Sequence, residues 1–377
     1  MKRSPVALLG AAALVAGSAL FSSPAAAGGH GQPGSPRTVA DGLLTPLKLA
    51  VSQHGRMYVS QNFAGELTRI LPNGTKTPVV TVPGEEVGGV SEHRGTVYWT
   101  TTGEGSAKVF AQRPGRGPQQ IADLFAYEST RNPDARTTYG FRDLPQACAA
   151  QFPASSPASY TGIVESHPYA TLPAGRRTLV ADAAANAIFS VGPRGQVRTL
   201  ATLPAVGTVA TAEALQAQGM PACAAGHTYY FEFVPTDIER GRDGSLYVTS
   251  LPGGPEDASL GARGGVFKID PRSGQARKVA GGFVGAVDLA LLPDGRIAVA
   301  ELFGGADGAG QVTMVRPRSS YRRTLDLASP AAVEWKGSRR HGSLYVTTDT
   351  FTGGEPAPVG KVQVLSFGSH RKHHHRR

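Results

Sequence analysis

Cysteine, tryptophan and charged residues are scarce in this sequence. Its 377 residues include only two Cys and two Trp, and Asp, Glu, Lys and Arg together make up 18%. Cys148 and Cys223 occur in no Cys-x-x-Cys or other metal-ligand spacing, so the sequence predicts no cysteine-based metal site. Glycine and proline are abundant by contrast, with 48 and 28 residues, which is typical of short strands joined by many turns.

Signatures of the common enzyme classes are also missing. The sequence has no Gly-x-Ser-x-Gly, no Walker phosphate loop and no His-Glu-x-x-His. Gly103-Glu104-Gly105 is interpreted as a loop rather than a nucleotide fingerprint. Asn73-Gly74-Thr75 is interpreted as a hairpin turn rather than a glycosylation acceptor. Whether the chain is an enzyme therefore stays open.

Positive charge is concentrated at the two ends of the chain. The formal net charge is +10, and six basic residues lie at the ends: Lys2, Arg3, Arg371, Lys372, Arg376 and Arg377. The part between them has no stripe of basic residues interleaved with aromatic ones, so we expect no nucleic-acid partner. The basic His-rich tail, residues 368–377, is a candidate contact to an anionic cell surface, with a solubilising tail as the alternative.

Residues 1–27 have the layout of a secretory signal peptide. Lys2 and Arg3 precede an apolar run from Val6 to Phe21, and Ala25-Ala26-Ala27 supplies the cleavage pattern. The run is shorter than the roughly 20 residues of a membrane-spanning helix, and no second apolar run follows. We therefore expect a secreted, extracellular protein with no transmembrane segment, and association with the cell wall stays open.

A six-fold repeat dominates the rest of the chain. Each copy pairs a turn glycine with a short β-rich run: His54–Val59, Arg94–Trp99, Gly175–Val180, Asp243–Val248, Asp294–Val299 and His341–Val346. Each copy lies within a unit of four such runs. Four antiparallel strands per unit, repeated six times, predict an all-β fold, a six-bladed β-propeller of the NHL/lactonase-like kind, over residues 28–367. A β-sandwich is the alternative, but it has no reason to repeat one four-run order.

The last unit is one run short. It has three runs before the tail, Ala331–Trp335, Leu344–Thr347 and Lys361–Ser366. Residues 37–40 read Arg-Thr-Val-Ala, like the outer runs of other units. The sequence therefore predicts that an N-terminal strand closes the last blade and completes its sheet.

Two insertions interrupt the repeat, near residues 125–167 and 204–234. Both lie between the fourth run of one unit and the first run of the next, so they open on the same face as the loops after each second run. Each insertion contains one cysteine, and in an exported protein a pair of cysteines favours a disulfide over two free thiols. We therefore predict a Cys148–Cys223 disulfide that ties the insertions over one end of the channel.

Polar residues gather at the loop ends of that face. The candidate binding residues at this channel mouth are His167, Asp182, Asp237, Glu256, Asp257 and Glu301. Asp182, Asp237 and Glu301 are also candidate ligands of one calcium ion, which prefers six to eight oxygen atoms. Turn caps and hydrogen bonds between blades are the structural alternatives, and no catalytic residue is assigned.

Several of these candidate residues lie in longer segments that resemble a known protein family. Ser166-His167-Pro168-Tyr169-Ala170, the segment Leu251 to Asp257 with its Pro-Gly-Gly-Pro-Glu-Asp, and Ala300 to Gly305 resemble the ScyD/ScyE family of secreted bacterial six-bladed propellers. The resemblance covers nearly all of residues 37–367, and the two insertions are similar to that family's as well. It implies a secreted propeller and supplies no catalytic residue. NHL repeats and calcium-dependent lactonases are similar at the level of the fold only.

Three functions fit this sequence. The first is a propeller that binds a small molecule, a glycan or a protein at the capped channel mouth. The second is a calcium-dependent, lactonase-like hydrolase that uses the three carboxylates. The third is a structural envelope protein that relies on the basic tail. The ligand is unknown, and calcium is the one cofactor candidate.

Overall fold

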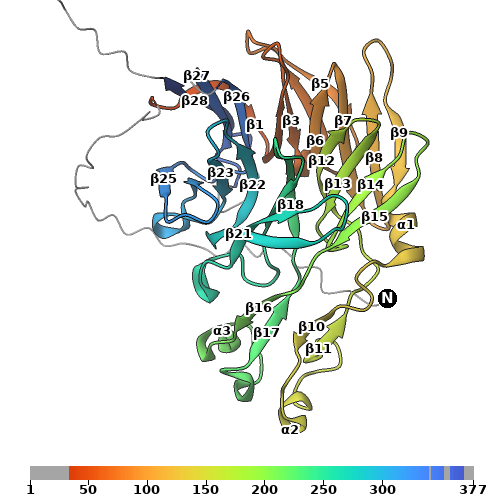
Figure 1. Ribbon diagram of the computed structural model, residues 1–377, viewed down its shortest axis with the longest axis vertical. Coiled ribbons are helices and arrows are strands. Elements are labelled where there is room, and N and C mark those ends of the chain that lie inside the picture. Colours follow the sequence, from red (N-terminus) through yellow and green to blue (C-terminus); the bar gives the residue numbers. More distant parts are fainter. Residues whose placement is uncertain (1–33, 339–340, 352–356, 369–377) are drawn as a thin grey trace, which may run out of the picture.

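The computed structural model describes residues 34–338, 341–351 and 357–368 (Figure 1). The predicted signal peptide and all of the tail after Gly368 lie outside these residues. Seven antiparallel sheets of four strands make up most of the described chain. Six of them follow the predicted repeat, and the seventh is formed by the insertions.

The six repeated sheets are built in nearly the same way, with four strands that follow one another from the innermost outward. They are β2 (Pro46–Val51), β3 (Met57–Gln61), β4 (Glu66–Ile70) and β5 (Lys76–Thr81); β6 (Glu86–His93), β7 (Thr96–Gly103), β8 (Ser106–Gln112) and β9 (Gln119–Asp123); β12 (Pro168–Ala174), β13 (Arg177–Asp182), β14 (Ala187–Val191) and β15 (Val197–Thr202); β18 (Pro235–Arg240), β19 (Leu246–Ser250), β20 (Gly264–Ile269) and β21 (Ala276–Phe283); β22 (Ala286–Leu291), β23 (Ile297–Glu301), β24 (Gln311–Val315) and β25 (Arg322–Asp326); and β26 (Val333–Gly337), β27 (His341–Thr348), β28 (Gly360–Gly368) and β1 (Arg37–Leu43). Short 3-10 turns follow three of the second strands: η1 (Asn62–Ala64), η3 (Ala258–Leu260) and η4 (Ala306–Gly308).

The first strands of these six sheets form a closed ring. β2 contacts β6, β6 contacts β12, β12 contacts β18, β18 contacts β22, β22 contacts β26, and β26 contacts β2 again. The second strands lie one layer further out, and their central valines, such as Val59, Val180 and Val248, are completely buried. Neighbouring sheets pack against both faces of the second strands, which explains why consecutive residues of β3, β13 and β23 are buried. This arrangement is that of a propeller.

The N-terminal strand closes the ring as predicted. β1 pairs antiparallel with β28, with Arg37 opposite Val364 and Leu43 opposite Gly360. The side chain of Leu43 is completely buried. The strand joins the last sheet to the start of the chain, so neither end of the ring is left without a partner.

The predicted turn chemistry holds in five of the six repeats. The first-turn glycines Gly55, Gly95, Gly175, Gly244 and Gly295 have φ between +67° and +87°. The prediction is wrong for Gly342, which lies inside β27 opposite Gly337. A Cβ there would come within 2.1 Å of the Trp335 ring, so this glycine makes room for an aromatic side chain rather than a turn. Pro78 lies in the outer strand β5, where an edge tolerates it.

The insertions form a seventh sheet that the sequence did not predict. Its strands are β10 (Thr138–Phe141), β11 (Ser159–Thr161), β16 (Val206–Val209) and β17 (Thr228–Phe231), in the order β11-β10-β17-β16. The helices α1 (Leu124–Arg131), α2 (Gln146–Ala149) and α3 (Ala212–Ala217) and the turn η2 (Ala222–Ala224) accompany it. In Figure 1 this sheet projects from one end of the ring.

The predicted disulfide is present in the seventh sheet. Cys148 and Cys223 are bonded, with their Cα atoms 5.9 Å apart, and Phe141 and Leu215 belong to the same apolar cluster as Cys148. The bond therefore links the two insertions directly. Within the described residues, no helix has the length and apolar character that crossing a membrane requires.

Candidate functional site

A cavity of about 690 Å³ opens at the end of the ring that carries the insertions. Its lining comes from the turn after β3, the start of β6, the loop after β7, helix α1 and the segment before β12. The lining combines apolar and acidic side chains: Phe63, Phe125, Ile163, Val164, Glu85, Glu86, Glu104, Glu165 and His167. No Lys or Arg is among the residues that line it. This cavity, which we call the mouth cavity, is both apolar and negatively charged.

One of the predicted residues, His167, lies in the wall of the mouth cavity. Its Nε2 is 3.0 Å from Glu86 Oε2, and its ring stacks on Tyr169 with the centroids 4.5 Å apart. Asn62 donates a second hydrogen bond to Glu86 Oε2 over 3.2 Å. Burial opposes ionisation of Glu86, but the hydrogen bonds from His167 and Asn62 keep its pKa below the ordinary value. In this pair Glu86 is therefore a carboxylate, and the His167 imidazole donates a hydrogen bond to it from Nε2.

Glu256 and Asp257 have different surroundings. Glu256 is half-buried, and burial raises its pKa against the opposing charge of Arg263. Burial raises the pKa of Tyr169, and the charges of Glu86 and Glu256 raise it further. Asp257 is exposed and accepts a hydrogen bond from Ser259 N over 2.9 Å, so it caps the short turn η3.

Asp182 is buried at the end of β13 and both its carboxylate oxygens face donors. Oδ1 accepts from His167 N over 2.7 Å and from Ala185 N over 3.1 Å, and Oδ2 accepts from the Ser166 hydroxyl. Burial raises the pKa of Asp182, while these three hydrogen bonds lower it. The carboxylate thus fixes two segments, the one that enters β12 and the turn that follows β13.

Glu301 has the same place and the same role in its own sheet. It ends β23 as Asp182 ends β13, and Oε2 accepts from Val284 N over 2.8 Å. Oε1 accepts from Gln311 Nε2 over 2.9 Å and from the Thr313 hydroxyl. Gln61 at the end of β3 likewise accepts from Leu44 N over 2.6 Å. The last residue of a second strand therefore acts repeatedly as a latch for the backbone that enters the first strand.

The three carboxylates expected to share a calcium ion are not brought together as a metal site. Asp182 and Glu301 are latches in different sheets, and Asp237 lies in the channel. Among the described residues, no group of three or more His, Cys, Asp or Glu side chains is arranged to hold a metal ion. The structural alternative that the sequence left open for Asp182 and Glu301 is the one their hydrogen bonds match.

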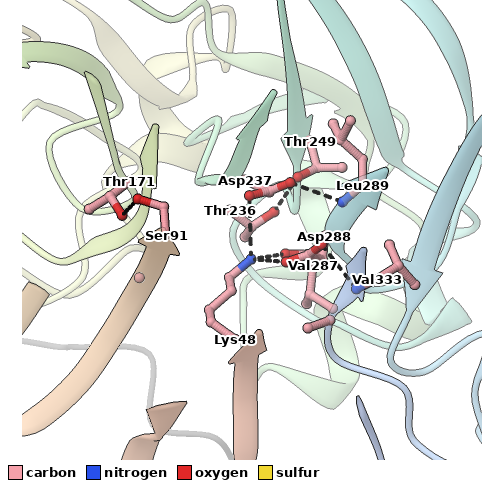
Figure 2. A network of polar contacts seen from close by, with 12 residues as sticks. Lys48, Ser91, Thr171, Thr236, Asp237, Thr249, Val287, Asp288, Leu289 and Val333 are labelled. Carbon is pink, nitrogen blue, oxygen red and sulfur yellow. Dashed lines mark hydrogen bonds and ion pairs between the residues drawn. The ribbon is translucent and has the colours of Figure 1, made fainter. Parts of the chain in front are cut away.

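Asp237 belongs to a buried charge cluster inside the ring (Figure 2). Lys48 Nζ donates to Asp288 Oδ2 over 2.7 Å and to Val287 O over 2.8 Å, and lies 3.9 Å from Asp237 Oδ1. Asp237 Oδ2 accepts from Leu289 N over 3.1 Å. Glu239, Glu334 and Lys336 line the same channel cavity of about 210 Å³. The cavity reaches His93 and Pro173 beside the first turns, at the end opposite the insertions.

The carboxyl groups of this cluster hold protons strongly. Burial and repulsion by Asp237 raise the pKa of Asp288 to about 8, against the opposing effect of Lys48. Burial and repulsion by Asp288 raise the pKa of Glu334 to about 8 as well. Burial, Glu334 and the two aspartates raise the pKa of Glu239 well above its ordinary range. Lys48 and Lys336 thus face Asp237, Glu239, Asp288 and Glu334, more acidic groups than two lysines can neutralise.

Sequence reasoning missed Glu86, Lys48 and Asp288. A signal for Lys48 and Asp288 was present, since each interrupts a first strand that is otherwise apolar, and charged residues are almost never buried without a partner. Glu86 had no local signal, because a polar residue at the start of a strand is ordinary.

The comparisons with known proteins address the fold. No family model and no curated protein matches the chain. A protein proposed to be a glucose dehydrogenase, from Thermus thermophilus, is 16% identical with a TM-score of 0.51, over 88% of this chain and 99% of that one. A PQQ-bound aldose sugar dehydrogenase from Streptomyces coelicolor is 14% identical with a TM-score of 0.50, over 90% and 98%. A protein proposed to be a gluconolactonase is 13% identical with a TM-score of 0.50, over 88% and 92%.

At these identities the likeness concerns the architecture and no particular activity. The seven four-stranded antiparallel sheets, the ring of contacting inner strands and these structural neighbours all indicate the same architecture. The fold is a β-propeller.

Proposed function

We propose that this protein is a secreted six-bladed β-propeller that binds a small molecule in the mouth cavity. The observation that carries the proposal is the cavity of about 690 Å³ with the Glu86–His167 pair in its wall. Small-molecule sites usually measure about 300–1,000 Å³ and combine an apolar lining with a few oriented polar groups. The apolar lining favours a small molecule over a glycan.

The ring of six contacting first strands supports the proposal of six blades. The seventh sheet then serves as an accessory that stands over the mouth. Secretion is supported by the Cys148–Cys223 bond, because disulfides persist in oxidising compartments, and by the layout of residues 1–27. Membership of the ScyD/ScyE family and contact of the tail with an anionic cell surface are part of the same proposal.

The chemistry of the lining suggests the class of ligand. Four glutamates face the cavity with no Lys or Arg among its lining residues. Phe63, Ile163 and Val164 stay 42–45% exposed, which is unusual for large apolar side chains unless something covers them. A ligand with one positively charged group and an apolar body matches both features.

Hexylamine, 1-hexanol and hexanoate test this preference by isothermal titration, because they differ mainly in charge. We expect hexylamine to bind most tightly, and Glu86→Gln to weaken it at least about threefold, since a charge-assisted contact is worth on the order of 1 kcal/mol. Glu213→Gln is the matched control, because Glu213 is an exposed acidic residue of the second insertion. Equal binding of hexanoate, or an unchanged affinity in Glu86→Gln, would refute the proposed chemistry.

A hydrolase is the second candidate, and the Glu86–His167 pair is the observation that favours it. An imidazole oriented by a carboxylate at a cavity wall is the usual arrangement of a general base. Under this hypothesis the wild type hydrolyses members of a panel of lactones and esters, and His167→Gln loses that activity while it keeps its melting temperature. A wild type inactive on the whole panel would leave binding as the function.

A further inference from the structure

A second group of acidic residues lies where helix α1 ends, outside the mouth cavity and the channel. Glu128 and Asp134 are 0% and 1% exposed. Both carboxylate oxygens of Glu128, Oδ1 of Asn132 and Oδ1 of Asp134 are buried and accept no hydrogen bond from any described residue. Four unsatisfied oxygens within one short segment are unusual, because most buried polar atoms have a partner.

The local backbone places these side chains on one side of the segment. Asn132 adopts a left-handed conformation, and its N–H donates to Glu128 O over 2.8 Å, which ends the helix and turns the chain. The Asn132 amide then donates to Gly162 O over 3.0 Å. A Cβ on Gly162 would be 2.0 Å from Asp134 Oδ1, so Asn132 and Asp134 both lie against this glycine. Burial, the charge of Asp182 and the charge of Asp134 all raise the pKa of Glu128.

Neighbouring groups orient the Asp134 carboxylate. Tyr139 OH and Asn186 Nδ2 both donate to Asp134 Oδ2, over 2.8 Å and 3.0 Å, and leave Oδ1 without a donor. This division of the two oxygens is typical of a metal-binding carboxylate held by outer hydrogen bonds. Asp182 lies within electrostatic reach of Glu128, but its own oxygens are engaged by the latch contacts.

A proton and a cation are the two ways to relieve this cluster. A proton on Glu128 neutralises one carboxyl group, and burial with the charges of Asp182 and Asp134 raises its pKa to about 8. That proton leaves the oxygens of Asn132 and Asp134 unsatisfied. A metal ion among these oxygens would give them a partner and compensate both carboxylate charges.

We propose that Glu128, Asn132 and Asp134 bind a calcium ion. All four donor atoms are oxygens, with no nitrogen or sulfur, and this set suits a hard cation. Two carboxylate charges match one divalent ion. Calcium accepts six to eight oxygens in flexible geometry, so water and backbone carbonyls complete its shell.

The position of the ion gives it a structural role near the mouth cavity. Glu128 shares helix α1 with Phe125, and Gly162 directly precedes Ile163, and both Phe125 and Ile163 line that cavity. A bound ion therefore fixes the segment 128–134, and the hydrogen bond from Asn132 to Gly162 O joins that segment to the second part of the cavity wall. The proposal does not depend on the nature of the ligand in the mouth, and it differs from the calcium site expected at Asp182, Asp237 and Glu301.

Calcium binding is measured on the purified chain after treatment with chelator, by isothermal titration and thermal melts. We expect one calcium per chain and a melting temperature at least about 2 °C higher in saturating calcium. Glu128→Gln and Asp134→Asn each weaken binding about tenfold or more, because each removes a charged ligand. Asp143→Asn is the control, because Asp143 is an exposed carboxylate of the same insertion, and it keeps wild-type affinity.

Terbium luminescence on the wild type gives a second measurement if a variant does not fold. Tyr139 bonds directly to Asp134, so its excitation sensitises a bound terbium ion, and calcium competes the emission away. A wild type with no bound calcium and no sensitised terbium overturns the proposal. A calcium response that survives Glu128→Gln but disappears in Asp288→Asn also overturns it, because the ion then lies in the channel.

Discussion

The channel cluster offers a sharp test of how this ring tolerates buried charge. Lys48→Met keeps the length and apolar stem of the side chain but removes the only group that donates to Asp288 Oδ2 among the described residues. It also removes the positive charge 3.9 Å from Asp237 Oδ1. Breaking a buried ion pair from one side costs about 3–5 kcal/mol, because the remaining charge stays desolvated.

The size of the protein converts this cost into a measurable shift. With an unfolding entropy of about 2.1 cal/mol/K per residue, a domain of this length loses about 1–2 °C of melting temperature per kcal/mol. We therefore expect Lys48→Met to melt about 4–8 °C below the wild type at pH 9, above the pKa of about 8 that Asp288 has in the wild type.

The effect depends on pH in a defined direction. The pKa of Asp288 is raised to about 8, so the folded protein retains protons that the unfolded chain releases. The contribution of such a group to stability is complete below its ordinary pKa near 4 and is lost as pH rises through about 8. Loss of Lys48 raises the pKa of Asp288 further, since Lys48 now lowers it. The gap between Lys48→Met and wild type should therefore be small at pH 5 and largest at pH 9.

Differential scanning fluorimetry from pH 5 to pH 9 measures this gap directly. The double variant Lys48→Met with Asp288→Leu is the control, because it removes both partners and restores part of the lost stability. A single variant that melts within 1 °C of the wild type at every pH would refute the reasoning. So would a gap that shrinks as the pH rises.

Three further predictions concern the scaffold. Deleting residues 28–43 removes β1 and exposes β28, and calorimetry should show a melting temperature at least about 3 °C lower; an unchanged value would contradict closure by this strand. The Cys148→Ser, Cys223→Ser double variant should lose about 4 kcal/mol of loop-closure stabilisation, which hydrogen exchange would show as faster exchange in the seventh sheet alone; uniform loss across the ring would contradict this. Asp182→Ala should cost about 2–4 kcal/mol in thermal melts by leaving three donors unpaired, and a calcium response that disappears with it would contradict the latch role.

The repeated part of the fold could be predicted because each sheet uses the same local signals. A turn glycine, an apolar second strand and a third run recur, and the predicted run Leu344–Thr347 lies within β27 (His341–Thr348). The seventh sheet could not be predicted, because it occurs once and its central strands come from two different insertions. Gly140 pairs with Tyr230 only after the chain has built an entire sheet between them. The error at Gly342 has a similar origin, since Trp335 sets its role across the sheet.

Of the six candidate residues at the channel mouth, only His167 lines the mouth cavity, and Asp257 caps a turn. Asp182 and Glu301 were interpreted as available carboxylates because loop ends are polar. The reason for their polarity is a bulge near the start of the first strands, between Pro168 and Ala170 and again between Ala286 and Asp288. Backbone groups beside each bulge need a partner, and the latch residue supplies it.

The mouth site lies where two sheets differ from the other sheets of the repeat. The residue that precedes the first strand position has positive φ in three sheets: Thr45, Val234 and Gly285, at 44°, 51° and 66°. By pairing register, Glu86 lies directly before the Val87–Thr101 pair as Thr45 lies before the Pro46–Gln61 pair. His167 lies directly before Pro168 in the next sheet, and neither Glu86 nor His167 has a positive φ. Since neighbouring sheets bring equivalent positions side by side, a change in two successive repeats creates a pair of facing side chains. A repeat assigns the same structural role to equivalent residues, so departures from it in adjacent units point to function better than polarity does.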